Sequence, residues 1–170
     1  MIETERLVLR PFTSSDATGF ARMFADPEPR QYTRYNEDNT PAEIQAVFEN
    51  HFLENPDTSF AIVLKSTQEI IGFFEFHEGG VMTYLLMKDQ WRKGYMPEAG
   101  RAAIDYAFRT LGYDGIEGDY ADVNGASGRV LEKMGLQPDG DLGTFDIPNG
   151  QRITVMVYRL TRQQWLESQH

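Results

Sequence analysis

Apolar side chains recur along the chain with two periods, and the changes of period divide the sequence into elements. Alternation of apolar and polar positions is typical of a strand, whereas apolar positions three and four residues apart are typical of a helix. Leu7 and Leu9 alternate with polar or outward positions up to Pro11, while Thr40 and Glu43 match the capping box of a helix start. The pattern predicts strands at 5–10, 60–64, 70–76, 81–87, 116–122, 136–145 and 152–160, helices at 14–25, 40–55, 97–111 and 126–134, and a loop at 30–39.

The order of these elements is β-α-α-β-β-β-α-β-α-β-β. Three consecutive strands joined by short polar segments predict an antiparallel meander, and the later alternation of helices and strands adds crossovers to it. We therefore expect the α+β (mixed α/β) class, with a central mixed, mostly antiparallel sheet and helices on both faces. A chain of 170 residues without an internal repeat or linker predicts a single domain, 1–170.

Composition narrows the class of protein. No run of about 18 apolar residues occurs and the N-terminus lacks the layout of a signal peptide, so we expect a soluble cytoplasmic protein with no membrane segment. The absence of cysteine excludes thiolate catalysis, and only three His residues leave little for a metal site, so no metal is expected. The net charge of −10 argues against general nucleic-acid binding and favours a cationic or neutral substrate.

The segment 91–99 carries the clearest chemical signal. It reads Trp-Arg-Lys-Gly-Tyr-Met-Pro-Glu-Ala and precedes a helix-forming run that ends before Gly112. Gly94 permits a tight turn, and a helix start leaves several backbone N–H groups without acceptors. Exposed amides beside Arg92 and Lys93 predict a site for an anion; the alternative is an ordinary turn with a solvated basic pair.

A second polar segment lies at the next junction between a strand and a helix. Asn124 and Ser127 stand three residues apart at the start of the helix 126–134. Asn is common as a helix cap, so this residue alone indicates little. Together with the segment 91–99, it predicts a crevice at the carboxyl ends of neighbouring strands, where open sheets commonly bind ligands.

At these motifs the chain resembles the GCN5-related N-acetyltransferases (GNAT), and specifically the branch of RimJ and RimL, which acetylate N-termini of ribosomal proteins. The resemblance covers nearly the whole chain: the opening at 3–12 (ETERLVLRPF), Ile71-Gly72, the segment 91–99, and the segment 124–136. The family's phosphate loop, (Gln/Arg)-x-x-Gly-x-(Gly/Ala), has Trp91 at its first position here and Met96 at its last. Where many members carry a tyrosine acid, this chain has Leu131.

The resemblance implies acetyl-CoA as cofactor and a set of residues that bind it. The pyrophosphate would lie over the amides of 92–97, although Pro97 has no N–H, and main-chain groups of Leu86 and Met87 would pair with the pantetheine. Asn124 would brace the junction, Lys133 or Arg129 would meet the 3′-phosphate, and Ser127 would protonate the leaving thiolate. The implied cofactor-binding residues are Leu86, Met87, Trp91, Arg92, Lys93, Gly94, Tyr95, Met96, Asn124 and Ser127.

The amine must lose a proton before it attacks a thioester, so a base is needed. Glu75 lies on the central strand and ranks first, with Ser127 as its partner acid. Alternative bases are Glu117, Asp119 and Asp122 on the facing strand, and His77. Each carboxylate could instead be an ordinary solvated strand residue.

The sequence therefore predicts an N-acetyltransferase that acts on a primary amine: a protein N-terminus, an amino-acid derivative or a small amine. The amine would attack the thioester directly. The alternative is a non-catalytic acyl-CoA-binding sensor or partner-binding module with the same fold. Pairing of the last strands at the sheet edge would allow a homodimer.

Overall fold

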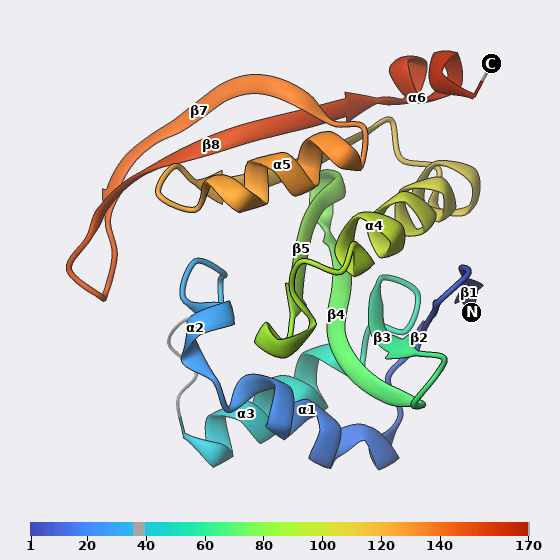
Figure 1. Ribbon diagram of the computed structural model, residues 1–170, viewed down its shortest axis with the longest axis vertical. Coiled ribbons are helices and arrows are strands. Elements are labelled where there is room, and N and C mark those ends of the chain that lie inside the picture. Colours follow the sequence, from blue (N-terminus) through green and yellow to red (C-terminus); the bar gives the residue numbers. More distant parts are fainter. Residues whose placement is uncertain (36–39, 170) are drawn as a thin grey trace. The chain divides into compact units, whose positions relative to one another are not determined.

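The computed structural model describes residues 1–35 and 40–169 (Figure 1). The chain forms two compact units. The first unit comprises Met1–Phe76 and Thr83–Ala103, and the second comprises His77–Met82 and Ile104–His170. Residues 36–39 of the loop expected at 30–39 lie outside the described residues. The single domain predicted from the sequence stays a prediction.

The first unit contains a sheet in the strand order β1-β2-β3-β4-β5. Strands β2 and β3 pair antiparallel with Leu9 opposite Ile62, and β3 and β4 pair antiparallel with Ser59 opposite Glu75. Residue 77 of β4 and residues 81 and 82 of β5 belong to the second unit. The strands are β1 (Ile2–Glu3), β2 (Leu7–Pro11), β3 (Ser59–Leu64), β4 (Glu69–His77) and β5 (Val81–Leu86).

Aromatic side chains form the core against one face of this sheet. Phe20 and Phe24 of α1 stack at 4.4 Å between ring centroids, and Phe52 lies 5.0 Å from Phe73 of β4. Strands β3 and β4 are buried on both faces, which explains their nearly continuous apolar sequence, whereas β2 buries only the face that carries Leu7 and Leu9. The helices are α1 (Ala17–Phe24, after a 3₁₀ turn at Ser14–Asp16), α2 (Pro27–Arg30), α3 (Pro41–Val47, followed by a π-helical turn at Phe48–Phe52) and the first residues of α4 (Tyr95–Tyr106).

The second unit contains the strand order β5-β6-β8-β7. Val81 of β5 pairs in parallel with Glu117 of β6, and the other pairs of this unit are antiparallel. Figure 1 shows β7 and β8 as a long curved hairpin. The elements are the rest of α4 with a π-helical turn at Ala107–Leu111, β6 (Gly115–Ala121), α5 (Gly125–Lys133), β7 (Gln137–Asp146), β8 (Arg152–Thr161) and α6 (Arg162–Ser168).

The main elements and the mixed α+β class are confirmed. The Thr40–Glu43 capping box is present, and Gly112 ends the helical segment in the left-handed conformation with φ 72°. Three short elements were not predicted: β1, α2 and α6. Thr161 and Gln164 form a capping box at α6, so that helix carried a readable signal.

No helix among the described residues is long and apolar enough to cross a membrane.

Candidate active site

The basic turn at residues 91–96, called the 91–96 turn below, joins β5 to α4 in the first unit. Two of its residues have left-handed backbone conformations, Arg92 with φ 64° and Gly94 with φ 80°. Glycine adopts that region freely, whereas arginine does so at a cost of about 1–2 kcal/mol. The turn is therefore partly strained and depends on contacts from outside it.

The N–H groups of this turn are available to a ligand. Among the described residues, the backbone amides of 92–96 donate no intramolecular hydrogen bond, and α4 begins at Tyr95. Arg92, Lys93 and Gly94 are exposed. Unpaired amides at the start of a twelve-residue helix, next to two cations, are suited to a phosphate group.

A hydrogen-bond network from the N-terminal segment fixes the base of the turn; it consists of Thr4, Arg6 and Glu98 and is called the Glu98 network below. Glu98 Oε2 accepts from Thr4 Oγ1 at 2.6 Å and from the Arg6 amide at 3.0 Å, and Oε1 accepts from Arg6 Nε at 2.8 Å. Desolvation alone would raise the pKa of Glu98, but the hydrogen bonds from Thr4 and Arg6 together hold it below its usual range. Sequence reasoning did not find this network.

The end of β5 has most of its main-chain groups bonded within the protein. Met87 donates its N–H to Ile71 O at 2.8 Å and accepts from the Gln90 amide at 2.9 Å. Leu86 O accepts from Trp91 Nε1 at 2.8 Å. Because successive residues of a strand direct their main-chain groups to opposite edges, the N–H of Leu86 points away from β4. Of the two main-chain positions expected to meet a pantetheine, Leu86 retains an available amide and Met87 does not.

Glu75 is fully buried, with 0% of its side chain exposed, and hydrogen-bonded side chains surround it. Its Oε1 accepts from the Tyr35 hydroxyl, and its Oε2 lies 2.8 Å from His51 Nε2 and accepts from Ser59 Oγ at 3.1 Å. Tyr35, His51, Ser59 and Glu75 are called the Glu75 cluster below. His51 is its most accessible member, since 34% of its side chain is exposed. The buried carboxylate is thus linked to the surface through one imidazole.

Aromatic rings enclose this cluster. Tyr35 lies 5.5 Å from Phe52 and 5.7 Å from Phe73 between ring centroids, and His51 lies 5.1 Å from Phe52. His51 lies in the π-helical turn, a feature that often occurs at functional sites. Sequence reasoning ranked Glu75 first but missed both ring partners. The spacing of His51, seven residues after the buried Ile44, places it on the apolar face of its helix and was the available signal.

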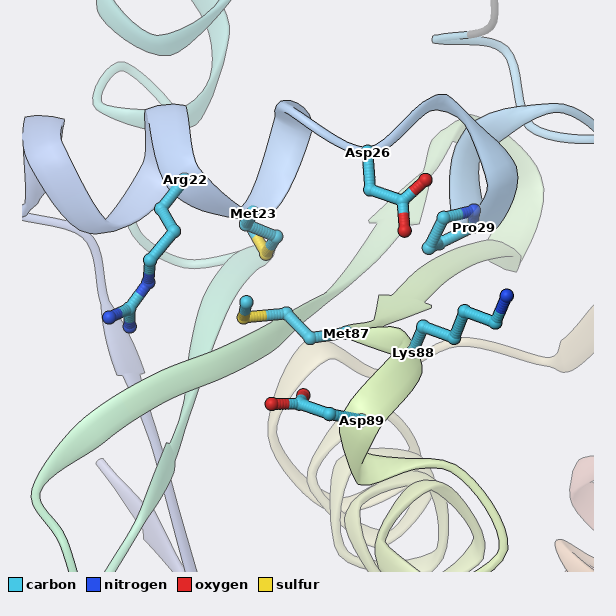
Figure 2. A pocket seen from close by; sticks show the side chains of 7 residues that line it. All are labelled: Arg22, Met23, Asp26, Pro29, Met87, Lys88 and Asp89. Atoms are coloured by element: carbon cyan, nitrogen blue, oxygen red, sulfur yellow. The ribbon is translucent and has the colours of Figure 1, made fainter.

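A cavity of about 510 Å³ opens beside the start of the 91–96 turn, still within the first unit. Figure 2 shows its walls: α1 and the segment before α2 on one side, and the residues after β5 on the other. Met23 and Met87 form its apolar wall. Lys88 pairs with Glu28 at 2.5 Å, which raises the pKa of the lysine. The residues lining the cavity are Arg22, Met23, Asp26, Pro29, Met87, Lys88 and Asp89.

The second unit holds Asn124 and Ser127 at the start of α5. Asn124 makes no side-chain cap to the helix; its Nδ2 instead donates to Ser127 Oγ at 2.9 Å. The serine oxygen is therefore an acceptor in this pair, so its own proton can be donated elsewhere. Leu131 is fully buried against Gly118.

Two of the lower-ranked carboxylates, Glu117 of β6 and Asp122 directly after it, have structural partners. Glu117 pairs with Arg159 at 2.6 Å, and Asp122 Oδ1 accepts the Thr154 amide at 3.0 Å. These bonds hold β6 to β8, which favours a structural role for both residues.

Comparison with known proteins places this geometry in a family. The model of the acetyltransferase (GNAT) domain matches residues 6–137, a span that includes the 91–96 turn, Glu75 and the Asn124 segment. The uncharacterized N-acetyltransferase p20 of Bacillus licheniformis is 29% identical over 171 residues, which is 95% of this chain and 96% of that protein.

Two solved structures have the same fold. The spermidine N-acetyltransferase from Vibrio cholerae, in complex with CoA and spermine, is 19% identical with a TM-score of 0.80, and the match covers 96% of this chain and 99% of that one. The ribosomal-protein-S5-alanine acetyltransferase from Vibrio fischeri is 24% identical with a TM-score of 0.74, covering 96% and 97%.

Proposed function

Because this chain belongs to the GNAT family of acetyltransferases, we propose that it transfers the acetyl group of acetyl-CoA to a primary amine by direct attack on the thioester. The observation that carries the proposal is the 91–96 turn, with its unpaired amides at a helix start. The spermidine N-acetyltransferase from Vibrio cholerae, which has the same fold, was solved in complex with CoA and spermine, and this supports the same cofactor here.

The residues of the first unit suit the phosphate and pantetheine parts of CoA. The amides of 92–96 would receive the pyrophosphate, with Arg92 and Lys93 adding positive charge. The Leu86 amide would pair with the pantetheine as an added strand does. Trp91 would act indirectly, because its indole N–H fixes the Leu86 carbonyl.

Acetyl-CoA supplies an activated acyl group on a thiol leaving group of low basicity. The amine nitrogen forms a bond to the acyl carbon, the carbon–sulfur bond breaks, and one amine proton must leave. We assign Glu75 as the group that receives this proton by way of a water molecule and the partly exposed His51, with Tyr35 and His51 bonded to its two oxygens. Ser127 would donate a proton to the departing thiolate and regain one from solvent water, a role compatible with the hydrogen bond it accepts from Asn124.

The cavity next to the 91–96 turn is the proposed site of the acceptor amine. Its volume of about 510 Å³ lies in the range of small-molecule sites. Asp26 and Asp89 provide carboxylates that can attract an ammonium group, while Met23 and Met87 can contact an alkyl chain. Arg22 would add a contact for a carboxylate, so amino-acid derivatives and peptide N-termini belong to the proposed range besides small amines.

The RimJ/RimL-like branch is part of the proposal. Its support is the opening motif at 3–12 and the shared fold of the ribosomal-protein-S5-alanine acetyltransferase from Vibrio fischeri. A cytoplasmic location, a homodimer and the lack of general nucleic-acid binding stay predictions from the sequence.

A thiol-release assay tests the proposed function. Because the chain contains no cysteine, a thiol reagent reports only the CoA that the reaction releases. Purified protein is mixed with acetyl-CoA and a panel of polyamines, amino acids and peptides with free N-termini. We expect thiol release with at least one of them and a product heavier by one acetyl group. CoA binding without turnover on any amine would favour the sensor module instead.

A further inference from the structure

The N-terminal segment contacts the 91–96 turn, although Arg6 and Lys93 are 87 residues apart in the sequence. Arg6, whose Nε is bonded to Glu98, also donates from Nη1 to the carbonyl of Lys93 at 2.9 Å. Its guanidinium lies 4.4 Å from the centroid of the Tyr95 ring. A Cβ at Gly94 would lie 3.4 Å from Arg6 Nη2, so the guanidinium lies against this residue as well. One side chain therefore contacts three consecutive residues of the turn.

The bond to Lys93 O determines where the next amide points. The carbonyl of Lys93 and the N–H of Gly94 belong to one planar trans peptide unit, in which the two groups point in opposite directions. When Arg6 holds the carbonyl on its own side, the Gly94 N–H is directed to the other side. This peptide unit turns about ψ of Lys93 and φ of Gly94, and glycine permits a wide range of φ, so a contact from outside the turn is needed to fix its direction.

Glu98 holds Arg6 in the required position. The Glu98 carboxylate accepts hydrogen bonds from both the side chain and the main-chain amide of Arg6. Through Arg6, the start of β2 is therefore connected to the start of α4. Thr4 adds a third bond to the same carboxylate. A charged pair with several hydrogen bonds and defined geometry restricts motion far more than an isolated surface ion pair.

We infer that Arg6 is a positioning residue for the cofactor: held by Glu98 and Thr4, it orients the amides of the 91–96 turn for the pyrophosphate before CoA binds. The inference rests on the proposed function for its ligand. It assigns the N-terminal segment, far from the turn in sequence, to the CoA-binding site.

The alternative is that the Glu98 network only stabilises the fold. The chain offers a matched control for this alternative, because Arg10 of the same strand β2 also pairs with a carboxylate. Arg10 Nη1 and Nη2 donate to Asp16 at 2.8 and 3.0 Å, and this pair joins β2 to the 3₁₀ turn before α1. Loss of either pair should lower stability, whereas only loss of the Arg6 pair should change the turn.

The test compares Arg6→Lys and Glu98→Gln with Arg10→Lys in two measurements. The first is hydrogen exchange of the peptide that covers 91–96, without ligand. We expect faster exchange in the Arg6 and Glu98 variants and an unchanged rate in Arg10→Lys. The second is the dissociation constant of CoA and of pantetheine, which lacks the pyrophosphate. We expect CoA binding to weaken about tenfold in the Arg6 and Glu98 variants, with pantetheine binding unchanged.

Three results would overturn the inference. Unchanged exchange of the 91–96 peptide in both variants would show that Arg6 does not orient the amides. Equal loss of CoA and pantetheine affinity would show that the effect does not act through the pyrophosphate. If the wild-type protein binds no CoA, the proposed function itself fails; if it binds CoA and the variants bind equally well, only the positioning role fails.

Discussion

Two carboxylates of the first unit, Glu75 and Glu98, have contrasting surroundings. Glu75 is fully buried on β4, and its contacts come from a phenol, an imidazole and a serine hydroxyl. Glu98 is partly exposed at the start of α4 and is bonded to a guanidinium. The first carboxylate is linked to the surface by a group that can exchange protons, and the second is paired with a group that stays protonated.

The different surroundings indicate different functions for Glu75 and Glu98, which the sequence alone does not distinguish. A carboxylate among hydroxyl and imidazole donors can take up a proton and pass it on, so it suits the chemical step. A carboxylate bound to arginine stays ionised, so it suits the fixing of structure. The following experiments test this separation, beginning with the largest expected effect.

Glu75→Gln should reduce kcat by about 100-fold or more, because the amide keeps the size of the side chain but cannot accept the amine proton. The affinity for CoA should stay the same, because the amides that bind CoA lie in the 91–96 turn. Steady-state kinetics with saturating acetyl-CoA, together with a CoA titration, measure both. A normal kcat in a folded variant would remove Glu75 from the chemistry.

Gly94→Ala should affect the binding of acetyl-CoA at the 91–96 turn, which the Glu98 network holds in place. A left-handed alanine costs about 1 kcal/mol of folding free energy, and its Cβ would approach Arg6 Nη2. We expect the KM for acetyl-CoA to rise by about tenfold with kcat nearly unchanged. Gly79→Ala is the control: Gly79 has φ 79° and nothing near its missing Cβ, so it has the same backbone cost without the contact. Equal kinetics in the two variants would contradict the account.

The low pKa of Glu98 predicts how stability depends on pH. A carboxyl whose pKa is lower in the folded state adds stability above its unfolded pKa, which is about 4.3 for Glu, and loses it as pH falls through the folded value. The difference in unfolding free energy between wild type and Glu98→Gln should therefore be constant near pH 7 and shrink below about pH 4. Urea unfolding at several pH values measures it. A difference in unfolding free energy that grows as the pH falls would contradict the lowered pKa of Glu98.

Ser127→Ala in the second unit should have the smallest effect. A thiol with a pKa of about 8.5 leaves with little help, so we expect kcat to fall by only about threefold. Steady-state kinetics at saturating acetyl-CoA and amine measure this change. A fall as large as that of Glu75→Gln would make Ser127 the dominant group instead.

Much of the fold could be predicted because the apolar pattern was regular. The capping box at Thr40 and the left-handed Gly112 depend only on residues close in sequence, and both are present in the structure. Element α2, four residues long, has too little sequence for a period, although Asp26 caps it through the Glu28 amide. Its position, like that of β1, depends on tertiary packing.

The site was less predictable for a physical reason. Glu75 could be ranked from its place on a central strand, and the 91–96 turn from its glycine and basic residues. Tyr35 and Arg6 meet their partners across 40 and 92 residues of sequence, so no local spacing indicates them. Main-chain groups of Met87 were expected to pair with the pantetheine, and only the structure shows that its N–H is bonded to Ile71 O.

The most direct test is one set of steady-state kinetics on wild type, Glu75→Gln and Glu98→Gln, with acetyl-CoA varied at a saturating concentration of the best amine. The account predicts thiol release by the wild type, a large loss of kcat confined to Glu75→Gln, and a raised KM for acetyl-CoA confined to Glu98→Gln. The same change of kcat and KM in both variants would contradict the division of roles between the two carboxylates.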